Sequence, residues 1–350
     1  MLYVLMCEDK PDSQSLRLAT RDAHLNYVGN HAEAIRVAGP MLGDDGEQMV
    51  GSLFLIEADD ADSVRAFHEA DPYTQAGLWG RRREWHCLRP EDSRLLEAAP
   101  RLRLVQKIGV GVNTIDLDTA RARNVAVCNM PGTNSRAVAE HALALMLAVL
   151  RQVPRFDADV RAGRGWSWPA PRQDVLGELG GRTVGLVGYG AVPRVLDPVL
   201  TALGARVIYT ARAPKPDVAA AYRDLDSLLT EADVVSLHVP LTPDTERLLD
   251  AKRLAMLRPG AVLINTARGA LVDEDALRDA LDGGHLAGAG LDVFATEPVP
   301  ADHPLLGLDN VVLAPHVAWL TGETLDNSLA VAVENCRRLA AGEPLLHRVA

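Results

Sequence analysis

The chain has 350 residues, 48% of them hydrophobic and 24% charged, which is enough apolar material for two or three globular domains. Its formal charge of −11 argues against nucleic acid or an anionic membrane as the main partner. The four cysteines show no metal-binding or pairing spacing, the start lacks a basic signal-peptide region, and no apolar run is long enough to cross a bilayer. We therefore expect a cytoplasmic protein without a metal site.

The first 88 residues predict a small α+β domain. Leu2–Met6 indicates a strand, and a helix follows, then Gly39-Pro40 and a turn at Gly43–Gly46. A second strand over Gly51–Ile56 leads to a helix near Asp62–Glu69. Strand, helix, strand and helix within so few residues are typical of an α+β unit.

The remainder of the chain predicts an α/β fold. Leu102–Ile108 and Val125–Cys128 indicate strands, and the Ala- and Leu-rich stretch Ala137–Arg151 predicts a helix that stops before Pro154. Apolar strands then alternate with helical stretches, at Thr183–Val187, Ala205–Tyr209, Val234–His238, Ala261–Asn265, Gly288–Asp292 and Val311–Ala314. This alternation predicts a doubly wound parallel (Rossmann) sheet with helices on both faces.

A glycine pair after the first of these strands predicts a dinucleotide site. Gly188 and Gly190 would let the backbone turn tightly beside a pyrophosphate, and the next helix would point its first amides at the phosphates. Pro193 replaces the third glycine of the usual fingerprint. Proline is tolerated in a first helical turn, so we expect a slightly displaced helix rather than a lost site.

The end of the second strand bears on the choice of cofactor. NAD-binding folds commonly place Asp or Glu there, whereas this chain has Thr210, Ala211 and Arg212, followed by Lys215. A hydroxyl and a cation suit a 2′-phosphate, so we predict a preference for NADP, with NAD as the alternative. Arg212 could instead be a solvated loop residue.

Three chemically complementary side chains follow later strands. Arg268, Glu297 and His316 would meet at the carboxyl edge of the sheet, where open α/β sheets bind ligands. The histidine can give a proton to a ketone oxygen or take it back, and the carboxylate would orient the ring and favour its charged form. The arginine can hold a carboxylate and polarise the neighbouring carbonyl.

These segments resemble the D-isomer-specific 2-hydroxyacid dehydrogenase family, from about Leu95 to Leu339. The resemblance also includes Gly109–Asp116, Ala139–Ala142 and His238–Thr242. It implies that Arg268 binds substrate, that His316 is the acid/base and that Glu297 is its partner. It further implies a substrate site with Val110, Gly111, Arg268 and Trp319, the last as in the C-terminal-binding-protein branch. The implied cofactor site comprises Gly188, Tyr189, Gly190, Ala191, Val192, Thr210, Arg212, His238, Val239, Pro240, Thr266, Ala267, Asp292 and His316.

The first domain resembles the YciI-like (YCII-related) family instead of the usual substrate domain. The matching residues include Met1–Val4, Thr20–Leu25, Ala38–Pro40, Gly51–Leu53 and Ala70–Tyr73. The resemblance implies a ferredoxin-like α+β fold with His24 and Asp71 as a candidate second site, which Ser52 joins. Two interpretations stay open: a second active centre, or a dimerising scaffold that shapes the substrate pocket.

Four segments are therefore expected: a YciI-like domain over 1–88, a linker and remnant of the substrate domain over 89–108, a nucleotide-binding domain over 109–318, and a C-terminal helix and tail over 319–350. We expect an enzyme that interconverts a 2-oxo acid and a D-2-hydroxy acid with NADP(H), as a homodimer. The alternatives are a nucleotide sensor with a vestigial site and a bifunctional enzyme. The sequence does not name the 2-oxo acid.

Overall fold

The computed structural model describes residues 2–43, 48–87, 96, 102–112, 114–164, 166 and 176–350. The chain divides into two compact units, unit 1 over Met1–Arg101 and Thr114–Thr119 and unit 2 over Leu102–Asn113 and Ala120–Ala350. Most of the turn expected at Gly43–Gly46 and of the linker expected at 89–108 lies outside the described residues.

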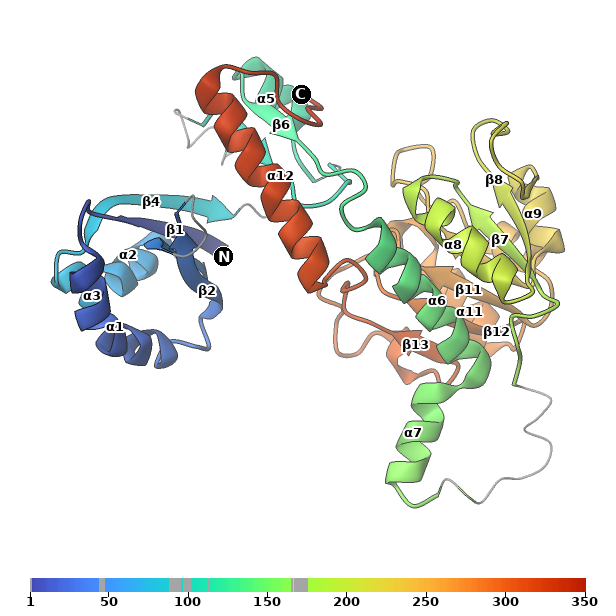
Figure 1. Ribbon diagram of the computed structural model, residues 1–350. Coiled ribbons are helices and arrows are strands. Elements are labelled where there is room, and N and C mark those ends of the chain that lie inside the picture. Colours follow the sequence, from blue (N-terminus) through green and yellow to red (C-terminus); the bar gives the residue numbers. More distant parts are fainter. Residues whose placement is uncertain are drawn as a thin grey trace. The chain divides into compact units, whose positions relative to one another are not determined.

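Unit 1 contains a four-stranded antiparallel sheet in the order β2-β3-β1-β4 (Figure 1). Its elements are β1 (Leu2–Asp9), α1 (Gln14–Gly29), β2 (Ile35–Leu42), β3 (Met49–Glu57), α2 (Ala61–Ala70), α3 (Pro72–Gln75) and β4 (Trp79–Cys87). Alternate residues of β1 and β3 point into one core, where Tyr3, Leu5, Phe54 and Ile56 pack against Val64 and Phe67 of α2. The α+β prediction is confirmed.

Two strands of this sheet were missed from the sequence because both lie at its edges. Gly39-Pro40 falls inside β2, where Pro40 pairs with Ser52 of β3. Proline is tolerated there because an edge strand leaves alternate N–H groups without a ladder partner. β4 lacks an apolar strand pattern in the sequence because it contains three consecutive arginines, Arg81 to Arg83. Charged residues are a common feature of edge strands.

Unit 2 is built on a seven-stranded parallel sheet in the order β13-β12-β11-β10-β7-β8-β9 (Figure 1). The strands are β7 (Thr183–Val187), β8 (Arg206–Thr210), β9 (Ala221–Tyr222), β10 (Val234–Leu237), β11 (Ala261–Asn265), β12 (Leu286–Leu291) and β13 (Val311–Leu313). The helical segments between and around them are α6 (Ser135–Arg151), α7 (Val153–Arg161), α8 (Ala191–Ala202), α9 (Leu225–Glu231), α10 (Ala251–Met256), η2 (Gly269–Leu271), α11 (Glu274–Asp282) and η3 (Pro304–Gly307).

The sheet is buried on both faces, as predicted. Val234 and Val262 belong to one core with α6 and α8, whereas their neighbours Val235 and Leu263 belong to a second core with α9, α10 and α11. Consecutive strand residues point to opposite faces, so two cores require apolar residues at every position. The order of the sheet reverses at β7, whose neighbours are β8 and β10, and such a switch point is where doubly wound sheets bind ligands.

The long predicted helix ends at Arg151 as expected, but a second helix follows at once. Gln152 adopts a left-handed conformation with φ +49°, and Pro154 then lies in the first turn of α7. Among the described residues no single helix has the length and apolar character of a membrane span; only α6 and α7 taken together reach it, across a bend of 61°.

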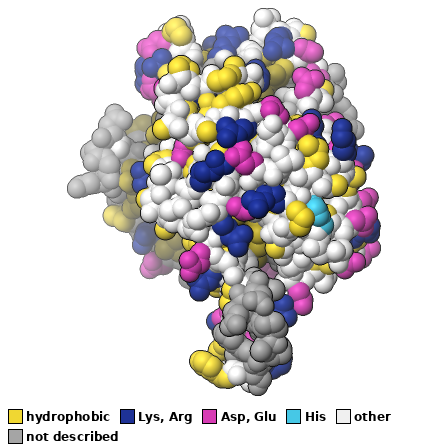
Figure 2. Space-filling view, turned by 90° about the vertical axis from the view of Figure 1, so that its right-hand side faces the viewer, with side chains coloured by type: hydrophobic (Ala, Val, Ile, Leu, Met, Phe, Trp, Pro, Cys, Tyr) yellow, Lys and Arg dark blue, Asp and Glu magenta, His cyan; other side chains and the backbone are white. Residues whose placement is uncertain are grey.

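The surface mixes charges of both signs. On the face shown in Figure 2, basic and acidic side chains lie next to one another, and apolar side chains occur in small groups between them. This face therefore lacks the continuous basic patch that a nucleic-acid phosphate backbone would require.

The C-terminal tail completes a small substructure of unit 2. β5 (Leu104–Gln106) pairs in parallel with β6 (Ala126–Cys128), and the tail adds an antiparallel bridge between Cys128 and Arg348. α5 (Leu117–Ala122) lies between these strands in the chain, and α12 (Gly322–Ala341) precedes the tail. The substructure thus joins segments that lie more than 200 residues apart in the sequence.

Asn335 of α12 holds this substructure together. Its fully buried amide donates to Gln106 Oε1 at 2.6 Å and to Leu346 O at 3.1 Å, and its Oδ1 accepts from Leu346 N at 2.7 Å. One side chain therefore joins α12, β5 and the tail.

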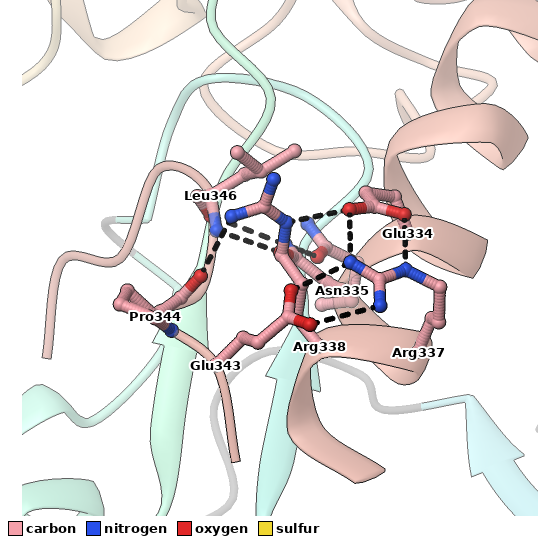
Figure 3. A network of polar contacts seen from close by, with 8 residues as sticks. Glu334, Asn335, Arg337, Arg338, Glu343, Pro344 and Leu346 are labelled. Atoms are coloured by element: carbon pink, nitrogen blue, oxygen red, sulfur yellow. Dashed lines mark hydrogen bonds and ion pairs between the residues drawn. The ribbon is translucent and has the colours of Figure 1, made fainter. Parts of the chain in front are cut away.

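Charged side chains around the end of α12 tie the tail to the helix at its surface (Figure 3). Arg337 bonds Glu334 and Glu343, and Arg338 bonds Glu334 and the Pro344 carbonyl. Hydrogen bonds from both arginines lower the pKa of Glu334 to about 2. The network is exposed to solvent, so its role is to orient the tail more than to stabilise the fold.

Candidate active site

The three candidate catalytic residues follow neighbouring strands of the parallel sheet. Arg268 follows β11, Glu297 follows β12 and His316 follows β13, and these strands pair directly with one another. Because the strands are parallel, their carboxyl ends meet at one edge of the sheet.

His316 and Glu297 form a hydrogen-bonded pair. Nδ1 of His316 lies 2.7 Å from Oε2 of Glu297, and the other carboxylate oxygen accepts from Phe294 N at 2.9 Å. Because Nδ1 is bound to Glu297, Nε2 is the ring nitrogen available for proton transfer. The His316 side chain is 39% exposed. The arrangement suits proton transfer at Nε2, with the carboxylate holding the ring's orientation.

The loop that carries His316 is organised by the carboxylate of Asp292. Asp292 is fully buried at the end of β12; its Oδ1 accepts from Val317 N at 2.8 Å and its Oδ2 from Ala318 N at 2.9 Å. Its backbone oxygen accepts from His316 N at 2.7 Å. Three consecutive amides thus converge on one residue, and His316 takes a left-handed conformation with φ +57°. Such a conformation persists in a non-glycine residue only when its surroundings enforce it.

The sequence predicted Asp292 as a residue that lines the cofactor pocket. The structure instead gives both carboxylate oxygens a partner in the His316 loop, with His141 Nε2 of α6 3.4 Å from Oδ1. Lining of the nicotinamide pocket stays a prediction, whereas support of the catalytic loop is what the contacts show.

Two residues that the sequence reasoning missed position Arg268. Asn265, buried at the end of β11, donates to Arg268 O at 2.8 Å and accepts from Ala267 N at 3.0 Å. A Cβ at Gly269 would lie 1.9 Å from the carbonyl carbon of Phe294, so only glycine lets the Arg268 and Glu297 loops touch. The one available signal was Asn265, a polar residue that ends an otherwise apolar strand.

Lys107, two residues before the start of the Gly109–Gly111 loop, lies close enough to Arg268 for their positive charges to interact. Burial lowers the pKa of Lys107, and the positive charge of Arg268 lowers it further. Burial likewise lowers the pKa of Arg268, opposed by the negative charge of Glu297. Two cations brought together beside this loop favour an anionic ligand. Val110, in that loop, is half exposed, and its carbonyl accepts from Asn129 Nδ2 at 2.9 Å.

The remaining predicted substrate residue is Trp319, which follows the Asp292-bound segment and is partly buried. Its backbone oxygen accepts from Thr321 N at 3.1 Å. Contact of its ring with substrate stays a prediction.

The glycine motif has the geometry that a dinucleotide requires. Gly188 has φ +94°, and a Cβ there would lie 2.7 Å from His238 O, so this position is restricted to glycine. A Cβ at Gly190 would meet no atom of the described residues within 4 Å, which leaves open space at the start of α8. Pro193 is the third residue of α8, where a missing N–H breaks no intrahelical bond, as predicted.

The other predicted cofactor residues lie at the same edge of the sheet. His238, Val239 and Pro240 follow β10; the first is tied to β7 by a bond from its amide to Val187 O at 2.7 Å. Thr266 follows β11, and its buried hydroxyl oxygen has no partner among the described residues. An unpaired buried hydroxyl and the open space at Gly190 both fit a bound dinucleotide.

The side chain of His238 is held neutral. Burial lowers its pKa to about 4, and Nε2 lies 2.9 Å from the hydroxyl of Ser236. At neutral pH the imidazole ring is therefore uncharged.

Unit 1 brings together only part of the predicted second site. His24 Nδ1 lies 2.8 Å from Asp71 Oδ1, both side chains are buried, and the His24 ring stacks on Tyr73 with 3.9 Å between centroids. Ser52 instead accepts from Arg17 Nη2 at 3.1 Å. Arg17, which the sequence reasoning missed, also binds Asp9, with Nε 2.6 Å from Oδ2.

Sequence comparison assigns both parts of the chain. Residues 143–318 match the profile described as the D-isomer specific 2-hydroxyacid dehydrogenase, NAD binding domain. The chain belongs to the D-isomer-specific 2-hydroxyacid dehydrogenase family. Residues 1–85 match the YCII-related domain. Both resemblances drawn from the sequence are confirmed.

Curated relatives include enzymes of two activities. D-3-phosphoglycerate dehydrogenase of Mycobacterium bovis is 43% identical over 257 residues, covering 72% of this chain and 48% of that protein. The chain thus spans about half the length of these phosphoglycerate dehydrogenases. Glyoxylate reductase of Thermococcus litoralis is 40% identical over 262 residues, covering 72% of this chain and 78% of that enzyme.

Solved structures support the same fold. An NADPH-dependent glyoxylate/hydroxypyruvate reductase from Sinorhizobium meliloti, solved with NADP and malonate, superposes with a TM-score of 0.68 at 35% identity, covering 74% of this chain and 81% of that one. The TT0316 protein of Thermus thermophilus superposes with a TM-score of 0.70 at 43% identity, covering 75% of this chain and 83% of that one.

Replacement of Asp292 should disturb both stability and catalysis. In Asp292→Asn one carboxylate oxygen becomes an amide donor that faces a backbone N–H, so we expect a loss of about 1–3 kcal/mol in the free energy of unfolding. Displacement of His316 should lower kcat by up to about 10²-fold. Chemical denaturation and steady-state kinetics measure the two effects. Asp250→Asn is the matched control, because the N-cap carboxylate of α10 accepts from Arg253 N and asparagine caps as well. Equal behaviour of the two variants would contradict the role of Asp292.

The neutral His238 should make the protein less stable in acid. Between pH 6.5 and pH 4 the unfolded chain binds a proton at this position and the folded chain does not, so stability falls as the pH falls. The contribution is at most about 1.4 kcal/mol per pH unit in that window. The slope of Tm against pH from 7 to 4.5 should become shallower in His238→Gln. An unchanged slope would show that the ring is protonated normally.

Proposed function

We propose that the protein reduces a 2-oxo acid to the corresponding D-2-hydroxy acid, with NADPH preferred over NADH. The observation that carries the proposal is the His316–Glu297 pair, which shares the carboxyl edge of one sheet with Arg268 and with the glycine motif. Family membership supports the reaction type.

Each side chain has a defined part in this reaction. The reduced nicotinamide supplies, when bound, the hydride that adds to the carbonyl carbon of the 2-oxo acid. His316 donates a proton from Nε2 to the carbonyl oxygen, while Glu297 holds Nδ1 and stabilises the ring. Arg268 binds the substrate carboxylate and, with Lys107, makes the site favourable for an anion.

The preference for NADPH rests on the end of β8. Thr210 ends this strand, and Arg212 is exposed in the loop that follows, where a 2′-phosphate of bound cofactor would lie. Relatives that support it include the Sinorhizobium meliloti reductase, which is NADPH-dependent. The glyoxylate reductases among the relatives suggest small 2-oxo acids as the first substrates to examine.

The decisive experiment measures loss of nicotinamide absorbance with a panel of 2-oxo acids, with NADPH and NADH side by side. Glyoxylate, hydroxypyruvate and larger branched or aryl acids should be included. We expect turnover that favours NADPH and falls roughly 10²- to 10⁴-fold in His316→Gln, with the Kd for NADPH unchanged because the glycine motif is intact.

Two results would overturn this proposal. Turnover that survives in His316→Gln would remove the acid/base role. Binding of NADPH without turnover of any acid would favour a nucleotide-sensing protein. Turnover with NADH preferred would keep the reductase and reject the role of Arg212.

A second candidate function concerns unit 1, which we propose as a dimerising domain with a general base of its own. The buried His24–Asp71 pair favours this, because a carboxylate bound at Nδ1 fixes the tautomer in which Nε2 can accept a proton. YCII-related domains supply the expectation of a homodimer, and exposed Val153 and Val160 on α7 of unit 2 would also suit contact with a second copy.

Proton abstraction by His24 can be measured without nicotinamide. Exchange of the C3 protons of hydroxypyruvate in D₂O, followed by NMR, should be faster with the protein and should lose that acceleration in His24→Ala. The same variant should keep its NADPH-linked turnover and, in sedimentation equilibrium, twice the mass of one chain. Equal exchange in both proteins would leave unit 1 as a scaffold, and a monomer mass for the unmodified protein would remove the dimer.

A further inference from the structure

The side chain of Tyr209 fixes the course of the loop that follows β8. Tyr209 is 1% exposed, and its hydroxyl oxygen accepts a hydrogen bond from Lys215 N at 2.7 Å. The backbone leaves β8 at Thr210, passes Arg212 and returns over the tyrosine. A buried side chain thus fixes the point at which this exposed loop turns back.

Tyr209 is itself rigidly placed. Its ring lies 4.6 Å from that of Tyr189, the residue between the two glycines of the motif, and 5.7 Å from that of Tyr222 in β9. Three aromatic rings in contact leave the central ring little rotamer freedom. The position of Lys215 is therefore coupled to the glycine motif through side chains rather than through the backbone alone.

An ion pair holds the far end of the same loop. Arg194 Nη1 of α8 lies 2.8 Å from Asp217 Oδ2, and the Arg194 guanidinium lies 5.7 Å from the centre of the Tyr189 ring. This pairing neutralises the loop carboxylate Asp217, which raises the pKa of Arg194 and lowers that of Asp217. The two remaining charged residues, Arg212 and Lys215, give this loop a net positive charge.

We propose that Tyr209 is a positioning residue for cofactor selection: its hydroxyl holds the loop over residues 211–218 so that Arg212 meets the 2′-phosphate of NADP. This inference rests on the proposed preference for NADP. The Arg212 side chain has no hydrogen-bond or ion-pair partner among the described residues, so the orientation of this cation depends on the loop backbone. Pre-ordering of the loop lowers the entropy lost when the phosphate binds.

The test separates the 2′-phosphate from the rest of the cofactor. Titration calorimetry gives the Kd of adenosine 2′,5′-bisphosphate and of 5′-AMP for the full chain, Tyr209→Phe and Tyr222→Phe. Tyr209→Phe keeps the aromatic stack and removes the two contacts of the hydroxyl with Lys215, from its N at 2.7 Å and to its O at 3.5 Å. In Tyr209→Phe we expect the Kd of adenosine 2′,5′-bisphosphate to rise roughly 3- to 10-fold while the Kd of 5′-AMP stays unchanged, so the ratio of the 5′-AMP Kd to the bisphosphate Kd falls by the same factor.

Tyr222→Phe is the matched control, because its ring belongs to the same stack and its hydroxyl lies 3.5 Å from Ala211 O, at the limit of a hydrogen bond. It should retain the selectivity of the unmodified protein. Full selectivity in Tyr209→Phe, or an equal loss for both nucleotides, would overturn the inference. An unmodified protein that does not distinguish the two nucleotides would instead overturn the proposed preference for NADP.

Discussion

The candidate catalytic edge of the sheet depends on one buried carboxylate. Asp292 directly follows β12 and accepts hydrogen bonds from the amides of the two residues after His316, so this loop is folded around a fully buried carboxylate. A carboxylate suits this position because it accepts at both oxygens and has no donor to misplace. The left-handed conformation of His316 is a consequence of this arrangement, and the hydrogen bond with Glu297 then fixes the orientation of the imidazole ring.

The same principle recurs around the site: residues that do no chemistry determine where the reactive groups lie. Asn265 bonds the backbone on either side of the Arg268 side chain, and Gly269 allows two loops to touch. Gly188 does the same between the glycine motif and His238. Close backbone approach and buried hydrogen bonds are what keep a site assembled from loops as precise as one built on regular elements.

Besides the parallel sheet of the NAD-binding domain, the chain holds two further structures. Unit 1 carries the YCII-related domain, and within unit 2 a small parallel pair of strands is completed by α12 and the tail. The second of these contains Lys107, whose positive charge interacts with that of Arg268. Two neighbouring cations in unit 2 would favour an anionic ligand.

The sequence by itself determined the two fold classes, the strands of the parallel sheet and the order of the motifs, because apolar runs and glycine spacing reflect local geometry. It indicated Arg268, Glu297, His316 and the glycine motif on the same grounds. Only the tertiary structure decided which groups Asp292, Asn265 and Tyr209 bind, and that β2 and β4 form the two edges of the first sheet. The amides that bind Asp292 lie 25 and 26 residues away in the chain, and β2 and β4 lie at sheet edges. A linear pattern carries no information about which backbone groups a buried polar side chain will bind.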